Sequence, residues 1–174
     1  LELTNAFAAI ANGGIYTKPV FFTQILDHNG KVLLENAPET KRVLKDSTAF
    51  LLTDAMSQSM ESSRMFASSG VSLNSTSAVA NIPGMSNAGK SGTTTNNNDI
   101  WFVGFTPYYT AGIWSGCDDN QKISAIGSST SYHKKIWKAI MTKIHEGLPG
   151  SVLCHNCPDL PEIRKACDPR CLRE

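Results

Sequence analysis

The sequence lacks the features that mark a membrane span, a nucleic-acid-binding surface or a disordered chain. Its longest uninterrupted apolar run, residues 6–11, is far shorter than the roughly 20 residues that a spanning helix needs. The 174 residues carry 16 basic and 15 acidic side chains, a net charge of +1 with no basic stripe. Hydrophobic residues make up 41% of the chain, which is enough to bury a core. These values predict a globular domain with no nucleic-acid partner and no membrane contact.

The first residues also lack the pattern of a signal peptide. The chain begins at Leu1, with no initiator Met and no basic region followed by an apolar one. Leu3, Phe7 and Ile10 already follow helical spacing, so the sequence enters a helix at once. We therefore expect the chain to be a fragment of a longer protein.

The first part of the chain combines helix, strand and turn signals. The initial helix is expected to end at Asn12, where two Gly residues follow. An Asn-Gly pair at residues 29–30 separates the strand-like runs 20–27 and 31–35, and it favours a hairpin whose two turn residues have positive φ. Asp46, followed by Ser, can cap a second helix.

The second part predicts a sheet. Residues 62–87 are rich in Ser and Asn and are expected to form a long loop. Three strand-like runs and an amphipathic helix follow, at residues 88–94, 100–106, 109–115 and 134–146. The expected fold class is α+β, an antiparallel sheet flanked by helices. Cys, Pro and charged residues dominate from residue 150, so we expect a domain over residues 1–149 and a Cys-rich tail over 150–174.

The first candidate for chemistry is Lys90-Ser91-Gly92, which Thr93 follows on the same predicted strand. One positive charge, two hydroxyls and a Gly that a ligand can approach suit a substrate with a carboxylate or a carbonyl group. A backbone N–H here could also stabilise a developing oxyanion. The alternative is an ordinary Lys on an edge strand beside a turn of small residues, and the short pattern alone favours that alternative.

A phosphate-binding loop is the competing interpretation of the same residues. Gly84, Gly89, Lys90 and Ser91 formally match G-x-x-x-x-G-K-[ST]. Such a loop needs a buried strand before it and a helix that starts at the Lys. Here the stretch after Lys90 is Ser, Gly, Thr and Asn, which are poor helix formers. We therefore expect no nucleotide and no other cofactor.

Longer segments around this triplet resemble the Lys-Thr-Gly region of class A penicillin-binding proteins. The resemblance covers about residues 1–146, and its most specific segments are residues 88–94, 99–107 and 112–118. It implies the fold of the penicillin-binding transpeptidases and serine β-lactamases. The implied activity is that of a serine D,D-transpeptidase, which cross-links peptidoglycan stem peptides by acyl transfer from D-Ala-D-Ala and is acylated by β-lactams. The implied location is the extracytoplasmic face of the bacterial membrane, with an anchor upstream of this chain.

The resemblance also implies roles for single residues. Lys90 would place a positive charge beside the terminal carboxylate of the substrate, and Ser91 and Thr93 would donate hydrogen bonds to that carboxylate. The backbone N–H of Thr93 would form half of the oxyanion hole. Gly92 would leave the strand bare enough for the substrate to lie alongside it.

The chain departs from the family pattern in three respects. Ser91 stands where Thr is usual, and Ser75-Thr76-Ser77 stands where Gly-Thr-Gly is usual. The nucleophile motif Ser-x-x-Lys and the Ser-x-Asn motif lie upstream in the family. The matches found here, at residues 131–134 and 72–74, are each expected about once by chance, and the first is better interpreted as the start of the last helix. We therefore expect an inactive fragment that needs the missing N-terminal part of its domain, or self-association, for stability.

Two further groups of residues are open to more than one interpretation. The tail holds four cysteines, at Cys154, Cys157, Cys167 and Cys171, which allow a zinc site, reduced thiols or two disulfides. The extracytoplasmic location implied by the resemblance favours disulfides. Cys117 is expected to be a small apolar strand residue. The histidines His28, His133 and His145 are expected to be solvated.

Two other functions remain compatible with the sequence. The chain could be a peptidoglycan-binding or β-lactam-binding module without catalysis, or a small secreted domain defined by its cysteine tail. Covalent labelling by a penicillin separates the enzyme from both alternatives.

Overall fold

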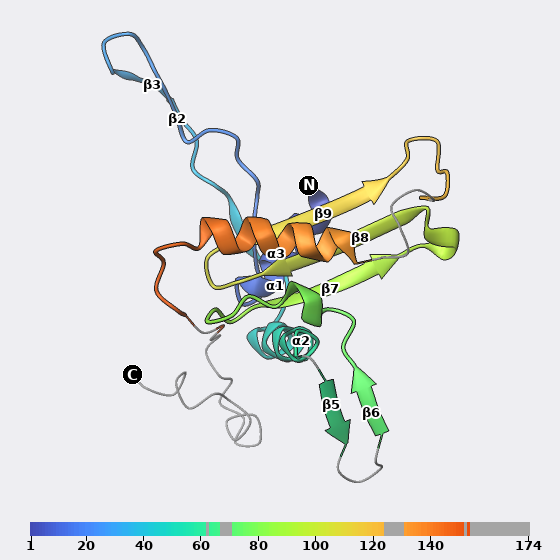
Figure 1. Cartoon of the computed structure of the whole chain (residues 1–174). Coiled ribbons are helices and arrows are strands. Elements are labelled where there is room, and N and C mark those ends of the chain that lie inside the picture. Colours follow the sequence, from blue (N-terminus) through green and yellow to red (C-terminus); the bar gives the residue numbers. More distant parts are fainter. Residues whose placement is uncertain (62, 67–70, 124–130, 152, 154–174) are drawn as a thin grey trace.

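The computed structural model covers the whole chain and describes residues 1–61, 63–66, 71–123, 131–151 and 153 (Figure 1). The helices are α1 (Glu2–Ala11), α2 (Asp46–Gln58) and α3 (Tyr132–Ile144), with 3-10 turns η1 (Ala78–Ala80) and η2 (Thr95–Asn97). The strands are β1 (Ile15–Thr17), β2 (Gln24–Leu26), β3 (Val32–Glu35), β4 (Thr40–Arg42), β5 (Ser63–Phe66), β6 (Val71–Asn74), β7 (Ala88–Thr93), β8 (Asp99–Phe105) and β9 (Thr110–Gly116). None of the described helices is long and apolar enough to cross a membrane. The four tail cysteines lie outside the described residues.

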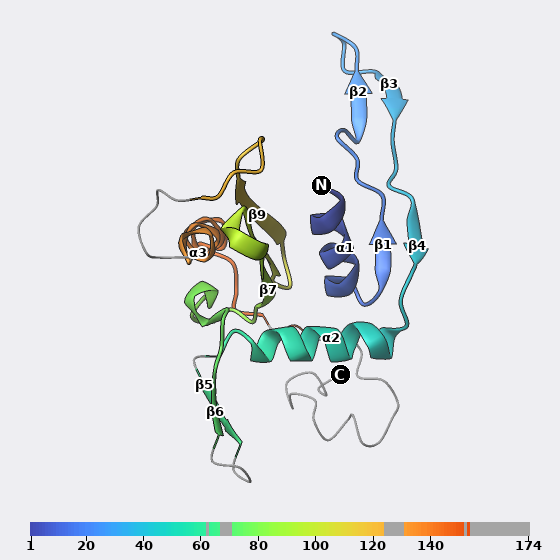
Figure 2. The same ribbon diagram turned by 90° about the vertical axis from the view of Figure 1, so that its right-hand side faces the viewer.

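The central sheet has three antiparallel strands in the order β7-β8-β9. Lys90 lies opposite Val103 on β8, and Phe102 of β8 lies opposite Ile113 on β9. Helix α3 covers one face of this sheet and α1 covers the other, so the molecule has a helix–sheet–helix arrangement at its centre (Figure 2). The α+β prediction and the three strands predicted from the sequence are confirmed.

Two aromatic residues form the core between α3 and the sheet. Phe102 and Trp137 are both fully buried, and their rings meet edge to face with centroids 5.2 Å apart. The indole Nε1 of Trp137 donates a hydrogen bond to the backbone oxygen of Ala111, 3.0 Å away. A Cβ on Gly104 would lie 2.7 Å from Trp137, and a Cβ on Gly89 would lie 2.6 Å from Phe102. The two glycines therefore leave the space that the rings occupy.

Of the two outer hairpins, the turn signals in the sequence predicted β2–β3 but not β5–β6. Strands β2 and β3 form the predicted hairpin, which projects away from the sheet (Figure 1). The expected pair of turn residues with positive φ is wrong, because only Gly30 has one. The carboxylate of Asp27 closes a wider turn by accepting from the N–H groups of Asn29 and Lys31. The region 62–87, expected to be a loop, contains the β5–β6 hairpin and η1.

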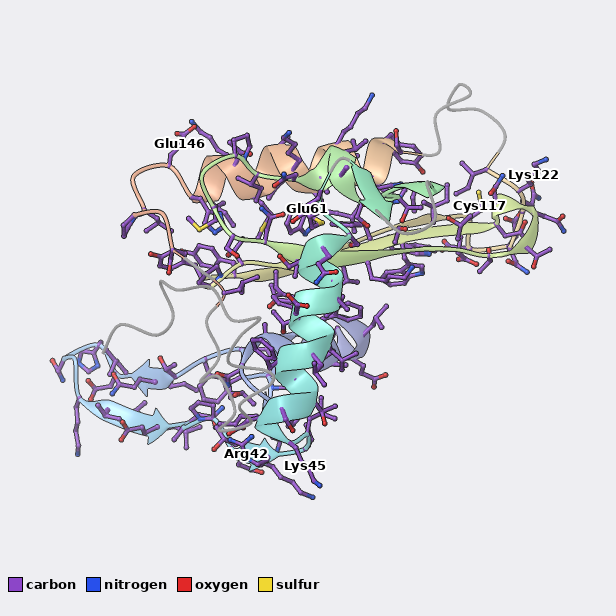
Figure 3. The ribbon with its side chains drawn as sticks, turned by 90° about the horizontal axis from the view of Figure 1, so that it is seen from below. Arg42, Lys45, Glu61, Cys117, Lys122 and Glu146 are labelled. Atoms are coloured by element: carbon purple, nitrogen blue, oxygen red, sulfur yellow. The ribbon has the colours of Figure 1, made fainter. Side chains whose placement is uncertain are left out.

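Helix α2 connects the outer strands to the sheet. Figure 3 shows it running from Arg42 and Lys45 at one end to Glu61 beside the sheet. The predicted Asp46 cap is wrong, since Lys45 is the N-cap residue and caps without a side-chain hydrogen bond. Asp46 lies in the first turn, where its negative charge interacts favourably with the helix dipole, and it forms an ion pair with Arg42. Arg42 also donates to the backbone oxygen of Gly13, which ties the end of α1 to the start of α2.

The packing of Trp137 over Gly104 yields a test of the fold. We expect Gly104→Ala to lower the free energy of unfolding by about 1–3 kcal/mol, because the new methyl group overlaps the indole. Gly92→Ala is the matched control, since its Cβ would lie 3.6 Å from the nearest atom, an ordinary contact. Thermal midpoints of the two variants give the comparison. Equal midpoints would contradict the packing described here.

Candidate substrate-binding strand

Strand β7 presents a free edge. Among the described residues it pairs only with β8, so its other side has no strand partner. The backbone oxygen of Gly89 accepts a hydrogen bond from the Ser59 hydroxyl at 2.9 Å, and that of Ser91 accepts one from the Lys90 ammonium at 2.7 Å. Both oxygens therefore point away from β8. Because backbone direction repeats every second residue in an antiparallel ladder, the N–H and C=O of Thr93 point the same way.

The side chains of the predicted site leave the strand on two faces. Ser91 lies opposite Phe102 and Thr93 lies opposite Ile100, so both belong to the face that α3 covers. Lys90 lies opposite Val103, on the face of α1. The long side chain of Lys90 reaches the free edge, where its ammonium is bonded to the oxygen of Ser91. The structure thus brings the Lys90 charge and the Ser91 hydroxyl to one edge, although they start on opposite faces.

Two residues outside the predicted set also lie at this edge. The hydroxyl of Ser91 donates to the hydroxyl of Thr76 at 3.4 Å, and the ammonium of Lys134 donates to the backbone oxygen of Thr76 at 2.6 Å. Burial lowers the pKa of Lys134, and the positive charge of Lys90 lowers it further. The sequence marked Thr76 only as a departure from a pattern and Lys134 only as the end of a chance motif. Their proximity follows from the packing of α3, which no local signal contains.

The turn between β7 and β8 holds the end of the strand. The N–H of Asp99 donates to the Thr94 hydroxyl at 2.8 Å, and the N–H of Thr94 donates to the oxygen of Asp99 at 3.0 Å. Asn96 and Asn97 have positive φ values of 67° and 61°, which Asn tolerates better than most residues. The turn keeps Thr93 in register at the exposed end of the strand.

Two of the three histidines differ from the prediction. His28 is exposed as expected, but His133 and His145 are buried. His145 connects α3 to the β8–β9 turn, since its Nε2 lies 2.8 Å from the Thr106 hydroxyl. His133 is 1% exposed, and neither of its ring nitrogens has a partner among the described residues. Burial, with a smaller effect of the Lys134 charge, lowers the pKa of His133 to about 4.

Neither Cys117 nor a cluster of metal-ligating side chains belongs to this edge in the part of the chain that the structure describes. Cys117 is exposed and follows the last residue of β9, so the prediction of an apolar strand position is wrong (Figure 3). Within the part of the chain that the structure describes, no three His, Cys, Asp or Glu side chains gather as metal ligands. The described residues at this edge offer ammonium groups, hydroxyls and backbone groups that the ladder to β8 does not use.

The sequence profile of one known family, described as "Penicillin binding protein transpeptidase domain", matches residues 1–142. Penicillin-binding protein 1A of Clostridium botulinum is 34% identical over 149 residues, which are 86% of this chain and 16% of that protein. Penicillin-binding protein 2D of Bacillus subtilis is 35% identical over 154 residues, covering 86% of this chain and 20% of that protein. The chain thus spans a fifth or less of the length of these relatives.

Solved structures give the same answer for the fold. Penicillin-binding protein 1A of Haemophilus influenzae superposes with a TM-score of 0.67 at 23% identity, over 86% of this chain and 27% of that one. The D,D-transpeptidase domain of a peptidoglycan glycosyltransferase from Eggerthella lenta gives 0.62 at 24% identity, over 84% of this chain and 32% of that one. The resemblance inferred from the sequence and the expected fold are confirmed.

The buried His133 predicts a pH-dependent stability. Its pKa is about 4 in the folded chain and near 6.5 in the unfolded chain, so the unfolded state binds a proton first as the pH falls. The stability from the neutral ring is present above the unfolded value and is lost as the pH falls toward the folded one. We expect a loss of about 2 kcal/mol between about pH 7.5 and about pH 5, measured by urea unfolding.

The variant His133→Leu should remove this part of the pH dependence, because Leu keeps the site filled and has no proton to bind. His28→Gln serves as the control, since His28 is exposed. An unchanged pH dependence in His133→Leu would show that His133 is not the responsible group.

Proposed function

The chain belongs to the penicillin-binding protein transpeptidase family, and we propose that residues 1–149 are the C-terminal part of a serine D,D-transpeptidase domain, with residues 150–174 as a separate tail. A Ser outside this chain attacks the penultimate D-Ala carbonyl of one stem peptide and releases the terminal D-Ala. An amine of a second stem peptide then takes the acyl group, and the Ser hydroxyl is restored. A β-lactam enters the first step and stays on the enzyme. The reaction takes place on the extracytoplasmic side of the membrane.

This chain supplies the strand that binds the donor substrate. The terminal carboxylate lies beside the Lys90 ammonium and accepts hydrogen bonds from the hydroxyls of Ser91 and Thr93. The substrate backbone pairs with the free edge of β7, as an added strand would. The N–H of Thr93 points away from β8, which suits a donor to the oxyanion of the tetrahedral intermediate.

Gly92 is the observation that carries this proposal. A methyl group at this position would make only an ordinary contact with Trp101, so the fold itself does not require Gly there. Gly92 is exposed and lies between the two residues whose backbone groups face the free edge. A bare position that packing does not need fits a strand along which another backbone must lie.

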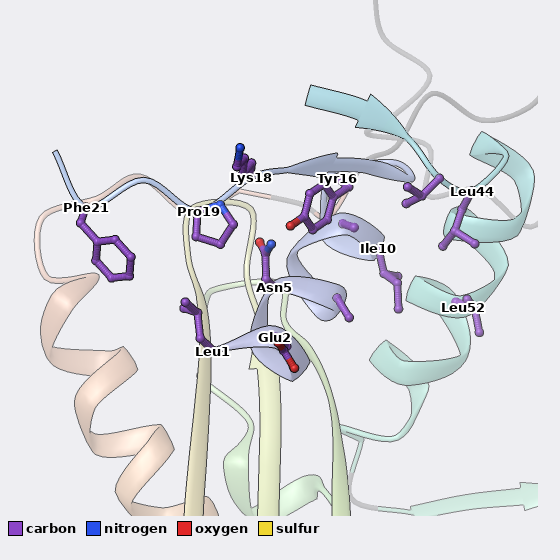
Figure 4. Close-up of a pocket in the computed structure, with 13 residues that line it drawn as sticks. Leu1, Glu2, Asn5, Ile10, Tyr16, Lys18, Pro19, Phe21, Leu44 and Leu52 are labelled. Atoms are coloured by element: carbon purple, nitrogen blue, oxygen red, sulfur yellow. The ribbon is translucent and has the colours of Figure 1, made fainter. Parts of the chain in front are cut away.

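The chain also has an apolar hollow away from the strand. A pocket of about 740 Å³ lies between α1, β1 and the start of α2, and Leu1, Ile10, Tyr16 and Leu52 are among its lining residues (Figure 4). Leu1 is 74% exposed and Phe21, at the rim, is 88% exposed. An exposed apolar surface of this kind is typical of a site that another protein segment covers. We assign it to the rest of the transpeptidase domain, with self-association of the chain as the alternative when that part is absent.

Substitution of Lys90 tests the proposed site in the longer protein that carries this chain. We expect Lys90→Ala to slow acylation by a fluorescent penicillin by about 10- to 150-fold, because a charge-assisted hydrogen bond to the carboxylate contributes about 1.5–3 kcal/mol. Lys90→Arg should recover only part of the rate, since the planar guanidinium spreads the charge. Ser91→Thr should be nearly silent, because it keeps the hydroxyl. Second-order acylation rates give the comparison.

Lys122→Ala is the control, since Lys122 is an exposed cation beyond the end of β9 (Figure 3). The chain alone, without a nucleophile, should remain unlabelled. An unaltered rate in Lys90→Ala would overturn the site assignment. Absence of covalent labelling in the longer protein would overturn the enzymatic function and leave the binding module.

A further inference from the structure

A second ammonium lies at the substrate-binding edge, on a helix that the family resemblance did not include in the site. Lys134 is the third residue of α3, and its Nζ donates to the backbone oxygen of Thr76 at 2.6 Å. The side chain of the same Thr76 accepts from the Ser91 hydroxyl at 3.4 Å. Lys134 therefore lies at the edge, where Thr76 links it to Ser91, whose hydroxyl is assigned to the substrate carboxylate.

Neither ammonium group at this edge forms an ion pair with a carboxylate of the residues that the structure describes. In the described ranges, the ion pairs are Lys18–Glu39, Arg42–Asp46 and Lys143–Glu146, and none of them involves Lys90 or Lys134. The Lys90 charge lies close enough to lower the pKa of Lys134, in addition to the effect of burial. Two like charges near one another repel, and the attraction of an anion to both of them offsets this repulsion. The edge is therefore electrostatically prepared for a negative ligand.

A purely structural role accounts for only part of this arrangement. Lys134 does hold the Thr76 backbone, but a neutral amide donor could make a hydrogen bond to a carbonyl without a charge. Lys134 is partly buried and lies within the electrostatic reach of Lys90, and both effects disfavour its charged form. The hydrogen bond to Thr76 therefore does not explain why the residue at position 134 carries a charge.

We propose that Lys134 is a positioning residue for the donor substrate: together with Lys90 it forms a two-cation corner that attracts the terminal carboxylate to Ser91 and Thr93. The inference rests on the proposed function and adds a residue to it. Lys134 attracts the carboxylate electrostatically from a distance and holds Thr76 in place. Lys90 and the hydroxyls of Ser91 and Thr93 make the direct contacts. The second charge raises the rate of productive binding rather than taking part in bond making or breaking.

The experiment uses the longer protein and benzylpenicillin, a β-lactam with one carboxylate. At low salt, Lys134→Gln should lower the second-order acylation rate by about three- to tenfold, and its rate should depend less on salt than that of the unmodified protein. At about 1 M salt, where the screening length is about 3 Å, the two rates should converge. Lys134→Arg keeps the charge and should retain most of the low-salt rate.

Lys135→Gln is the matched control, because it removes the same charge from the neighbouring exposed residue of α3. A low-salt rate in Lys134→Gln equal to that of Lys135→Gln would overturn the inference. So would an equal loss at every salt concentration in Lys134→Gln and Lys134→Arg, since that result assigns to Lys134 only the support of Thr76. If Lys90→Ala slows acylation while Lys134→Gln does not, the inference fails and the proposed function stands. If the longer protein is not acylated at all, the proposed function fails and the inference fails with it.

Discussion

The indole of Trp137 can pack onto β8 because Gly104 has no side chain, and the rest of the structure depends on that close approach. The ring fixes the distance between α3 and the sheet and is held in place by its hydrogen bond to Ala111. Phe102 fills the neighbouring space, which Gly89 leaves open on β7. With α3 held at this distance, the first turn of the helix places Lys134 over the Thr76 segment and next to the free edge. The core and the site are therefore parts of one packing arrangement.

Strand β7 has to satisfy two opposite demands. The ladder to β8 stabilises one side of the strand, whereas the proposed function needs an unpaired edge on the other side for a ligand. Unpaired edges invite aggregation, and proteins commonly protect them with charges, with Lys above all. Lys90 and Lys134 place such charges at this edge, and in the function proposed here they also attract the substrate carboxylate.

Much of the sheet could be predicted from the sequence because its signals are local. The β-branched and aromatic runs around Phe102 and Ile113 predict strands. The burial of His133 and the meeting of Lys134 with Thr76 could not be predicted, because both depend on how α3 rotates onto the sheet. The β1–β4 pair joins residues 15–17 with 40–42 across an intervening hairpin, and such short distant strands carry little periodicity. The family resemblance identified Lys90 and Ser91, but it contained nothing about a cation on α3.

The central claim is that the free edge of β7 binds the donor substrate through Lys90, Ser91 and Thr93. A crystal structure of the longer protein acylated by a penicillin tests it most directly. We expect the penicillin carboxylate to lie within about 3 Å of the hydroxyls of Ser91 and Thr93, with the acyl amide antiparallel to β7. A carboxylate bound elsewhere, or a β7 edge already occupied by another strand of the same protein, would contradict the account.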